Sequence, residues 1–258
     1  LSTCWFGLST AEFILPVLIV YLLTITSWQN IWISISILVL IFLPMASFTL
    51  IKNLNFDSRE ELKNIDSKEK DIKQWKRIEV IKDYRFYILS LNMLAMPWLA
   101  TGIFVYQSFI TDSKMWSIYT VPKAFMVYSI TSIATLFLTG FLVDKFTGRK
   151  LILFMNIPLL LAMLVLFQFK HEMFAYIFLG LIGISNGLAN ILGSSTWAEI
   201  YGVRYIGSIK ALTTAFMVFS TAFGTGIFGF LIDSGFTIEN IAFIGVAYIV
   251  ISLFLLIF

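Results

Sequence analysis

The sequence predicts an all-α polytopic membrane protein with eight transmembrane helices. Of its 258 residues, 59% are hydrophobic and only 13% are charged, whereas a soluble domain carries about 25% charged residues. Seven windows without charge approach or exceed the roughly 20 residues that a helix needs to cross a bilayer. The first window, 13–51, is long enough for two helices, which the polar residues 27–30 divide. A soluble helical core is the alternative, but its helices would each show a polar stripe, and these show almost none.

The predicted spans, in chain order, are 5–26, 31–51, 84–110, 116–143, 150–169, 173–196, 207–232 and 239–258. They divide the chain into a pair of helices at 1–51, a hydrophilic loop at 52–83 and six helices at 84–258. The first span is not expected to be a signal peptide, because it lacks a basic start and carries Glu12.

The hydrophilic loop contains two helical signals. Ser58 and Glu61 have the spacing of a capping box. Ile72, Trp75 and Ile78 recur every three residues among basic side chains, which suits a helix on the membrane surface with Trp75 at headgroup depth. A solvated linker with a short helix is an equal alternative.

The basic residues predict the orientation. If the helices alternate, fifteen of the eighteen Lys and Arg residues fall on one face, and only Lys114, Lys123 and Lys170 fall on the other. Short loops rich in Lys and Arg stay in the cytoplasm, so the loop and both ends of this sequence are expected to be cytoplasmic, in a protein of the plasma membrane. Topology thus explains the net charge of +3, and no nucleic-acid partner is expected. Cys4 and His171 lack partner ligands, so neither a metal nor another cofactor is expected.

An internal repeat is predicted from two similar pentapeptides. Gly140 to Asp144 (GFLVD) ends the fourth span, and Gly229 to Asp233 (GFLID) ends the seventh. These are the middle helices if the last six form two sets of three. An odd number of helices per set inverts the second set, which puts Asp144 inside and Asp233 outside. Inverted repeats are typical of secondary transporters, with the substrate path near the membrane midplane. A chance match is the alternative.

The stretch from Gly140 to Lys150, GFLVDKFTGRK, resembles the cytoplasmic signature loop of the major facilitator superfamily. The stretches 77–107 and 197–210 are similar to bacterial members of the same superfamily. The resemblance implies twelve helices in two six-helix bundles, a central cavity and rocker-switch alternating access. It makes the present helices the fifth to the twelfth, so four helices are expected before Leu1 and the sequence is expected to be a fragment. Thr147 departs from the pattern, because glycine is common at that position and Gly148 follows it here.

Glu12 is the only acidic residue of the sequence that lies well inside a predicted span. A charge there costs about 3 kcal/mol, so such residues are functional by default. Pro16 lies four residues on and deprives the Glu12 carbonyl of its helical donor. We interpret Glu12 as a carrier of protons or a ligand for a cationic group, with a protonated side chain bonded to a neighbouring helix as the alternative.

Asn186 and Asn190 are one turn apart, share a helix face and are predicted to line a cavity. The other candidates for a substrate or proton pathway are Asn92, Tyr106, Gln107 and Tyr128. Their alternative role is to join helices, because polar groups inside a membrane must find partners.

The resemblance also implies a cytoplasmic charge cluster that holds the inner ends of helices together in one state and releases them in the other. Its predicted members are Gly140, Asp144, Arg149 and Lys150, with Glu199 and Arg204 as a second pair.

The predicted function is secondary active transport of a small solute across the lipid bilayer by alternating access, with proton coupling left open. An enzyme is not expected, because Asp144 and Asp233 lie on opposite predicted sides and cannot form the dyad of an intramembrane aspartyl protease. A channel would show a repeated pore motif or charged rings. A channel, or a non-transporting scaffold or receptor, is the alternative.

Overall fold

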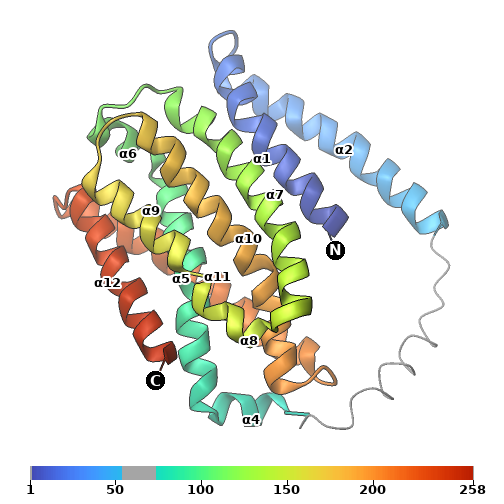
Figure 1. Cartoon of the computed structure of the whole chain (residues 1–258). Helices are drawn as coiled ribbons and strands as arrows, with labels where there is room; N and C mark the ends of the chain where they lie inside the picture. Colours follow the sequence, from blue (N-terminus) through green and yellow to red (C-terminus); the bar gives the residue numbers. More distant parts are fainter. Residues whose placement is uncertain (1, 54–73, 258) are drawn as a thin grey trace. The chain divides into compact units, whose positions relative to one another are not determined.

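The computed structural model describes residues 2–53 and 74–257, and every element in these ranges is helical. Figure 1 shows the arrangement. The elements are α1 (Ser2–Leu23), α2 (Trp28–Asn53), α4 (Arg77–Lys82), α5 (Tyr84–Val105), α6 (Gln107–Lys114), α7 (Thr120–Phe146), α8 (Gly148–Leu151), the 3-10 turn η1 (Ile152–Phe154), α9 (Ile157–Gln168), α10 (Met173–Tyr201), α11 (Ile206–Asp233) and α12 (Ile238–Ile257).

Seven helices of the described ranges are long and apolar enough to cross a membrane. The chain is therefore an all-α protein with the architecture of a polytopic membrane protein. The apolar stretch Thr10–Leu23 of α1 is shorter than a crossing, so the count of eight spans stays a prediction. The third predicted span is shorter than expected, because α5 ends at Val105 and α6 begins after Tyr106.

The fifth predicted span is interrupted, because α8 passes through η1 before α9 begins. Pro158 stands in the first turn of α9 and has no backbone N–H to donate. The Ser185 hydroxyl donates to the Met155 carbonyl at 3.0 Å, and the Asn156 amide donates to the Asn92 carbonyl at 2.6 Å. Irregular backbone at membrane depth is tolerated where the protein supplies such partners.

The chain divides into two compact units by packing. One contains residues up to Pro16 together with Gln74–Phe258, and the other is Val17–Lys73. In the second unit, α2 exposes apolar side chains along its length, as Leu40 does at 75%. The predicted boundaries after residues 51 and 83 stay predictions. The capping box at Ser58 and the side chain of Ile72 lie outside the described residues.

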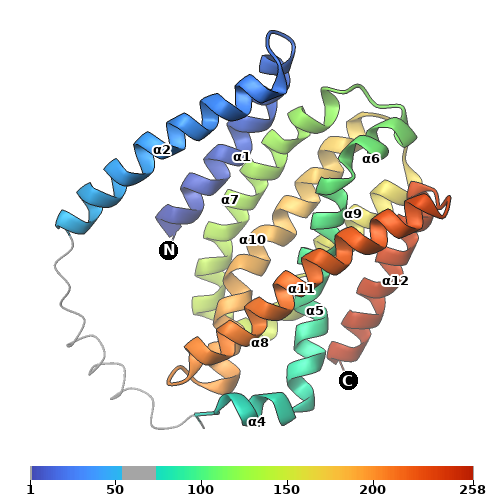
Figure 2. The same cartoon turned by 180° about the vertical axis from the view of Figure 1, so that it is seen from behind.

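Within the larger unit, the long helices α5, α7 and α9 pack mainly on the helices α10, α11 and α12. α7 packs on α10, α5 packs on α11, and α9 and α12 pack on each other; α9 also contacts α10, and α12 also contacts α5. α7 and α11 run in opposite directions, so their last residues lie at opposite ends of the bundle (Figures 1 and 2).

Glycines bring α7 and α10 close together. A Cβ atom at Gly187 would lie 2.7 Å from the Ser132 carbonyl oxygen, and one at Gly183 would contact the Tyr128 carbonyl. The Thr131 hydroxyl also donates to the Gly180 carbonyl at 2.9 Å. Small residues allow this backbone-to-backbone approach, which makes α7 and α10 a tight pair.

Polar contacts tie the loops at the end of the bundle where α6 lies. Lys114 Nζ and Glu239 Oε1 form an ion pair of 2.8 Å, with the Lys114 side chain fully buried and that of Glu239 29% exposed. Trp116 Nε1 donates to the Lys170 carbonyl at 2.6 Å, and the Ser117 backbone N–H donates to Glu172 Oε1 at 2.9 Å. α6, the α9–α10 loop and α12 are thereby joined.

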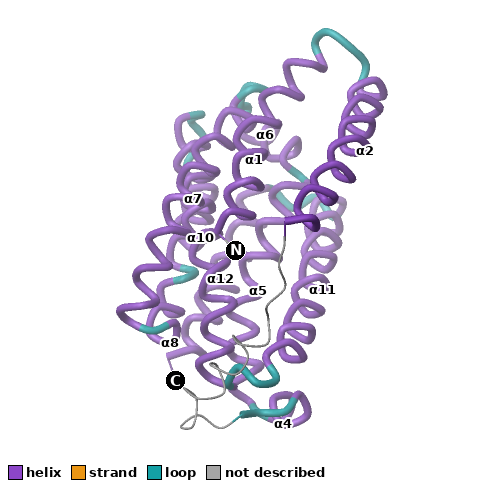
Figure 3. Tube along the Cα trace, turned by 90° about the vertical axis from the view of Figure 1, so that its right-hand side faces the viewer, coloured by secondary structure: helices purple, strands orange, loops and turns teal. Residues whose placement is uncertain are grey.

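At the other end, the segment before α4 is docked on the protein. Trp75 precedes α4, its backbone N–H donates to the Tyr201 carbonyl at 3.0 Å, and its ring meets the Tyr201 ring edge-on at 5.5 Å. Of the two interpretations of this segment, the surface helix does not include Trp75, because Trp75 precedes the short helix α4 and packs on the aromatic cluster of Tyr201, Trp197 and Phe86. α4, α8 and the α10–α11 turn share this end (Figure 3).

Candidate solute cavity and charge cluster

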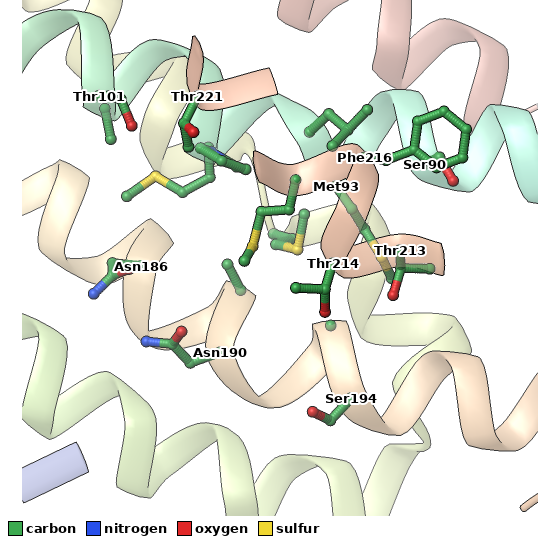
Figure 4. Close-up of a pocket in the computed structure, with 18 of the residues that line it drawn as sticks. Ser90, Met93, Thr101, Asn186, Asn190, Ser194, Thr213, Thr214, Phe216 and Thr221 are labelled. Carbon is green, nitrogen blue, oxygen red and sulfur yellow. The ribbon is translucent and has the colours of Figure 1, made fainter. Parts of the chain in front are cut away.

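A cavity of about 520 Å³ lies among α5, α10 and α11, with Tyr128 of α7 and Met155 contributing to its wall. Figure 4 shows the side chains that α5, α10 and α11 present to it. Its lining residues are Ser90, Met93, Leu94, Met96, Pro97, Ala100, Thr101, Phe104, Tyr128, Met155, Asn186, Ala189, Asn190, Gly193, Ser194, Trp197, Lys210, Thr213, Thr214, Phe216, Met217 and Thr221.

A polar stripe on α10 forms one wall. Asn186, Asn190 and Ser194 recur every four residues and line the cavity, because residues at this spacing share a helix face. The Asn186 amide donates to the Ser132 hydroxyl on α7 at 3.0 Å. The Asn190 side chain forms no hydrogen bond within the described part of the chain, so its amide is available to a solute.

Hydroxyl groups of α11 and α5 face this stripe and were not predicted. Thr214 and Thr221 are seven residues apart on α11, and Thr101 lies on α5; all three line the cavity (Figure 4). The seven-residue spacing was visible in the sequence. It carried no signal by itself, because threonine hydroxyls often bond their own helix, as Thr221 does to the Val218 carbonyl at 2.7 Å.

The rest of the wall is apolar and adaptable. Four of the nine methionines, at 93, 96, 155 and 217, line the cavity together with Phe104 and Trp197. Methionine fills irregular spaces and tolerates varied partners. Among the described residues that line the cavity there is no Asp or Glu, and the one charged side chain is that of Lys210. The cavity therefore offers neutral hydrogen bonds and apolar contact rather than a counter-charge for a cation.

Tyr128 lines the cavity and also packs against aromatic side chains of α5 and α7. It is 3% exposed, and its ring packs edge-on against Phe104 at 5.6 Å and Phe125 at 5.7 Å. Glu12 on α1 is half-buried and lies within electrostatic range of Tyr128. Glu12 forms no ion pair with another described residue, so a role in proton transfer stays a prediction.

The other three pathway candidates do not line the cavity. Asn92 is fully buried, and neither atom of its side-chain amide has a hydrogen-bond partner in the described part of the chain. Tyr106 stands between α5 and α6 and stacks on Phe228 at 6.3 Å. Gln107 is exposed. Their predicted part in a substrate path therefore has no counterpart in the cavity wall.

Glu199 organises the predicted charge cluster, with partners that differ from those expected. Its carboxylate accepts from the backbone N–H of Gly148 at 2.7 Å and of Arg149 at 3.1 Å. The Arg149 guanidinium donates to the Glu199 carbonyl at 2.8 Å. Glu199 does not pair with Arg204, which is exposed and lies over the ring of its neighbour Tyr205. Glu199 binds the start of α8 because unpaired amides at a helix start attract a carboxylate.

The remaining cluster members are exposed. Asp144 and Lys150 are exposed, and Asp144 forms no ion pair with a described residue, so the expected pairing of Asp144 with Arg149 and Lys150 is absent in this state. Gly140 is partly exposed, and a Cβ atom there would have no neighbour within 4 Å. The cluster is therefore held by Glu199 and the start of α8 rather than by Asp144.

The signature loop adopts an unusual backbone at its departure from the family pattern. Thr147 has φ 71°, in the region that favours glycine. Gly148 instead packs tightly, because a Cβ there would lie 2.9 Å from the Ser195 hydroxyl and 3.1 Å from Glu199 Oε1. Thr147 thus has a backbone conformation that favours glycine, whereas Gly148 lies where a side chain would meet its neighbours.

The two predicted residues of the second pentapeptide, Gly229 and Asp233, lie near the C-terminal end of α11. A Cβ at Gly229 would contact the Tyr106 hydroxyl, and Asp233 is exposed at the end of α11. Because α7 and α11 end at opposite ends of the bundle (Figure 2), Asp144 and Asp233 do not form a common site. Comparisons with protein families, curated proteins and solved structures return no match for this chain.

Proposed function

We propose that this protein is a secondary transporter of the major facilitator type that moves a small solute by alternating access. The cavity lined by Asn186 and Asn190 carries the proposal. A cavity of about 520 Å³ inside a bundle of membrane-length helices suits a small molecule, and such sites combine apolar walls with a few polar groups. The solute would place an apolar body against the methionines and a neutral polar group against Asn190.

The packing of the six helices supports the inverted repeat. A two-fold relation between α5–α7–α9 and α10–α11–α12 would exchange the pair α7–α10 with α11–α5, and the pair α9–α10 with α12–α5. All four of these contacts are present, as is the contact between α9 and α12. The opposite directions of α7 and α11 agree with the same relation. Carriers with inverted repeats bind solute at the repeat interface.

The distribution of basic residues supports the proposed orientation. α4, α8 and the turn after α10 carry Arg77, Lys82, Arg149, Lys150 and Arg204 and share one end of the bundle (Figure 3). That end would face the cytoplasm. The contact of Glu199 with Gly148 and Arg149 would then hold α10 to α8 on the inner side, as an inner latch that can form in only one of two helix packings.

The test is solute exchange by the full-length protein in liposomes. Vesicles are loaded with a mixture of small metabolites, the released compounds are identified by mass spectrometry, and counterflow of the selected compound is measured. A carrier shows selective, saturable counterflow. Release of the whole mixture according to size would identify a channel, and absence of any release would favour a scaffold or receptor.

Asn190→Leu should raise the KM for counterflow about tenfold, because a solute group that loses a buried hydrogen-bond partner costs about 1–3 kcal/mol. Asn240→Leu is the matched control, since Asn240 is exposed on α12 and lies outside the cavity wall. An equal rise of KM in both variants would exclude Asn190 from the solute site.

A further inference from the structure

A second pocket, of about 280 Å³, lies where α5, α8, α10 and α12 meet. Two arginines, Arg85 and Arg149, belong to its wall together with Thr196. Its remaining wall is aliphatic and includes Leu89, Ile152, Leu153, Ile200 and Leu256. The pocket therefore has a cationic part formed by two arginines and an apolar part, whereas the solute cavity has one charged side chain, Lys210, among the described residues of its wall.

The pocket lies at the depth of lipid headgroups. Arg85 is the second residue of the apolar span that begins at Tyr84, and Arg149 is the second residue of the span that begins at Gly148. Leu256 is the last residue of its span. Three span ends thus meet at one level, where the hydrocarbon core gives way to the headgroup region.

The positive charges of the pocket are only partly offset by the protein, through the electrostatic interaction of Arg85 with Asp83. Neither Arg85 nor Arg149 forms an ion pair with a carboxylate of the described residues. The two nearest acids are bound elsewhere: Asp83 accepts from the Arg85 backbone N–H at 3.0 Å and from the Tyr201 hydroxyl at 3.2 Å, and Glu199 accepts from the backbone at the start of α8. The bond from the Arg149 guanidinium to the Glu199 carbonyl holds the Arg149 side chain in place.

An unused polar group completes the pocket. Thr196 is fully buried, and its hydroxyl has no hydrogen-bond partner in the described part of the chain. A buried hydroxyl without a partner costs free energy, so a ligand that accepts a hydrogen bond here would recover it. A phosphate oxygen accepts hydrogen bonds from hydroxyl groups and from guanidinium groups, which bind phosphate well.

We propose that this pocket binds an anionic phospholipid, with the phosphate between Arg85 and Arg149 and an acyl chain along Leu89, Leu153 and Leu256. The apolar wall decides for a lipid over free phosphate, because a soluble anion would leave that wall uncovered. Leu153 is 36% exposed and its neighbour Phe154, outside the pocket wall, is 58% exposed, so apolar surface that an acyl chain could cover continues beside the pocket. Bound lipid would lie against both α8 and α10, next to the Glu199 contact.

Native mass spectrometry of the full-length protein in non-ionic detergent tests the site. 1-Palmitoyl-2-oleoyl-phosphatidylglycerol is titrated, with the phosphatidylcholine of the same chains as a control for the apolar part. Arg85→Gln and Arg149→Gln should each weaken phosphatidylglycerol binding about fivefold, since one basic residue near a membrane contributes about 1 kcal/mol. The double variant should fall about twentyfold, to the level of phosphatidylcholine. Thr196→Val should weaken binding about twofold to threefold.

The matched control is the double variant Lys145→Gln with Lys150→Gln. It removes two charges at the same end of the bundle, from exposed residues outside the pocket, and should leave binding within about twofold. Equal losses in the lysine and arginine double variants would show general attraction to the basic end and overturn the site. Full displacement by inorganic phosphate would assign the site to a free anion instead. Arg85→Lys with Arg149→Lys keeps the charge and should retain most of the binding, which separates lost charge from lost folding.

Discussion

The pairs α7–α10 and α5–α11 correspond to each other in the proposed repeat, yet they pack differently. α7 and α10 touch backbone to backbone at Gly183 and Gly187. The backbones of α11 and α5 approach each other in the second half of α11, where Gly224 lies against Trp98. In its first half, Thr214 and Met217 stand between the helices and line the cavity. Glycine positions therefore decide where two helices pack closely and where they leave a space.

The largest effect is expected for Gly183→Ala. In most helices this change stabilises by about 0.5–1 kcal/mol. Here the new methyl group would meet the Tyr128 carbonyl and the Thr131 hydroxyl, and a backbone carbonyl cannot rotate away. Parting α7 from α10 should cost about 2–3 kcal/mol, measured as the free energy of unfolding by SDS titration in micelles. Gly193→Ala is the control on the same helix, because nothing lies within 4 Å of a Cβ there; equal stabilities of the two variants would contradict the tight pair.

Gly224→Ala should cost less, about 1–2 kcal/mol, although its Cβ would also meet backbone, at the Trp98 carbonyl. α11 has the cavity along its first half and can tilt to relieve the contact, whereas α10 has α7 along its length. The same titration measures the loss, with Gly226→Ala as the control in open space. A loss larger than that of Gly183→Ala would reverse the ranking of the two pairs.

The smallest effects are expected for the hydrogen bonds that join each pair. Thr131→Val removes the bond to the Gly180 carbonyl at 2.9 Å, and Ser220→Ala removes the bond to the Leu94 carbonyl at 3.2 Å. Each should cost about 0.6 kcal/mol, the usual size for bonds between membrane helices. Losses above about 2 kcal/mol in unfolding titrations would show that these bonds, rather than the glycines, hold the pairs together.

The helical architecture could be predicted from the sequence, because apolar windows of membrane length have few other folds available. The helical period predicted that Asn186 and Asn190 share one face of a helix, and in the structure both line the cavity while Asn186 also bonds to Ser132 of α7. The surroundings of Asn92 could not be predicted from the period and polarity of its span. Asn92 is an equally polar residue in an equally apolar span, yet it is buried beside the interrupted start of α9. Nothing in its local sequence distinguishes the two surroundings.

Charged residues show a similar limit. The sequence placed Glu199 in a cluster at the basic end of the bundle, but opposite charge suggested Arg204 as its partner. The structure gives it the backbone of Gly148 and Arg149 instead. Arg204 is only five residues from Glu199 in the sequence, but the two side chains do not pair. The packing of α8 against α10 instead places two unpaired amides at hydrogen-bond distance from the Glu199 carboxylate.

By itself the sequence determined the class of protein, the placement of the apolar segments and the basic character of one end, since these depend on composition and period. Only the tertiary structure decided which polar residues meet, which residues line the cavity and that two arginines share a pocket with an unpartnered threonine. Those features arise from contacts between helices distant in the chain, and such contacts depend on shape at glycine positions that local sequence patterns do not encode.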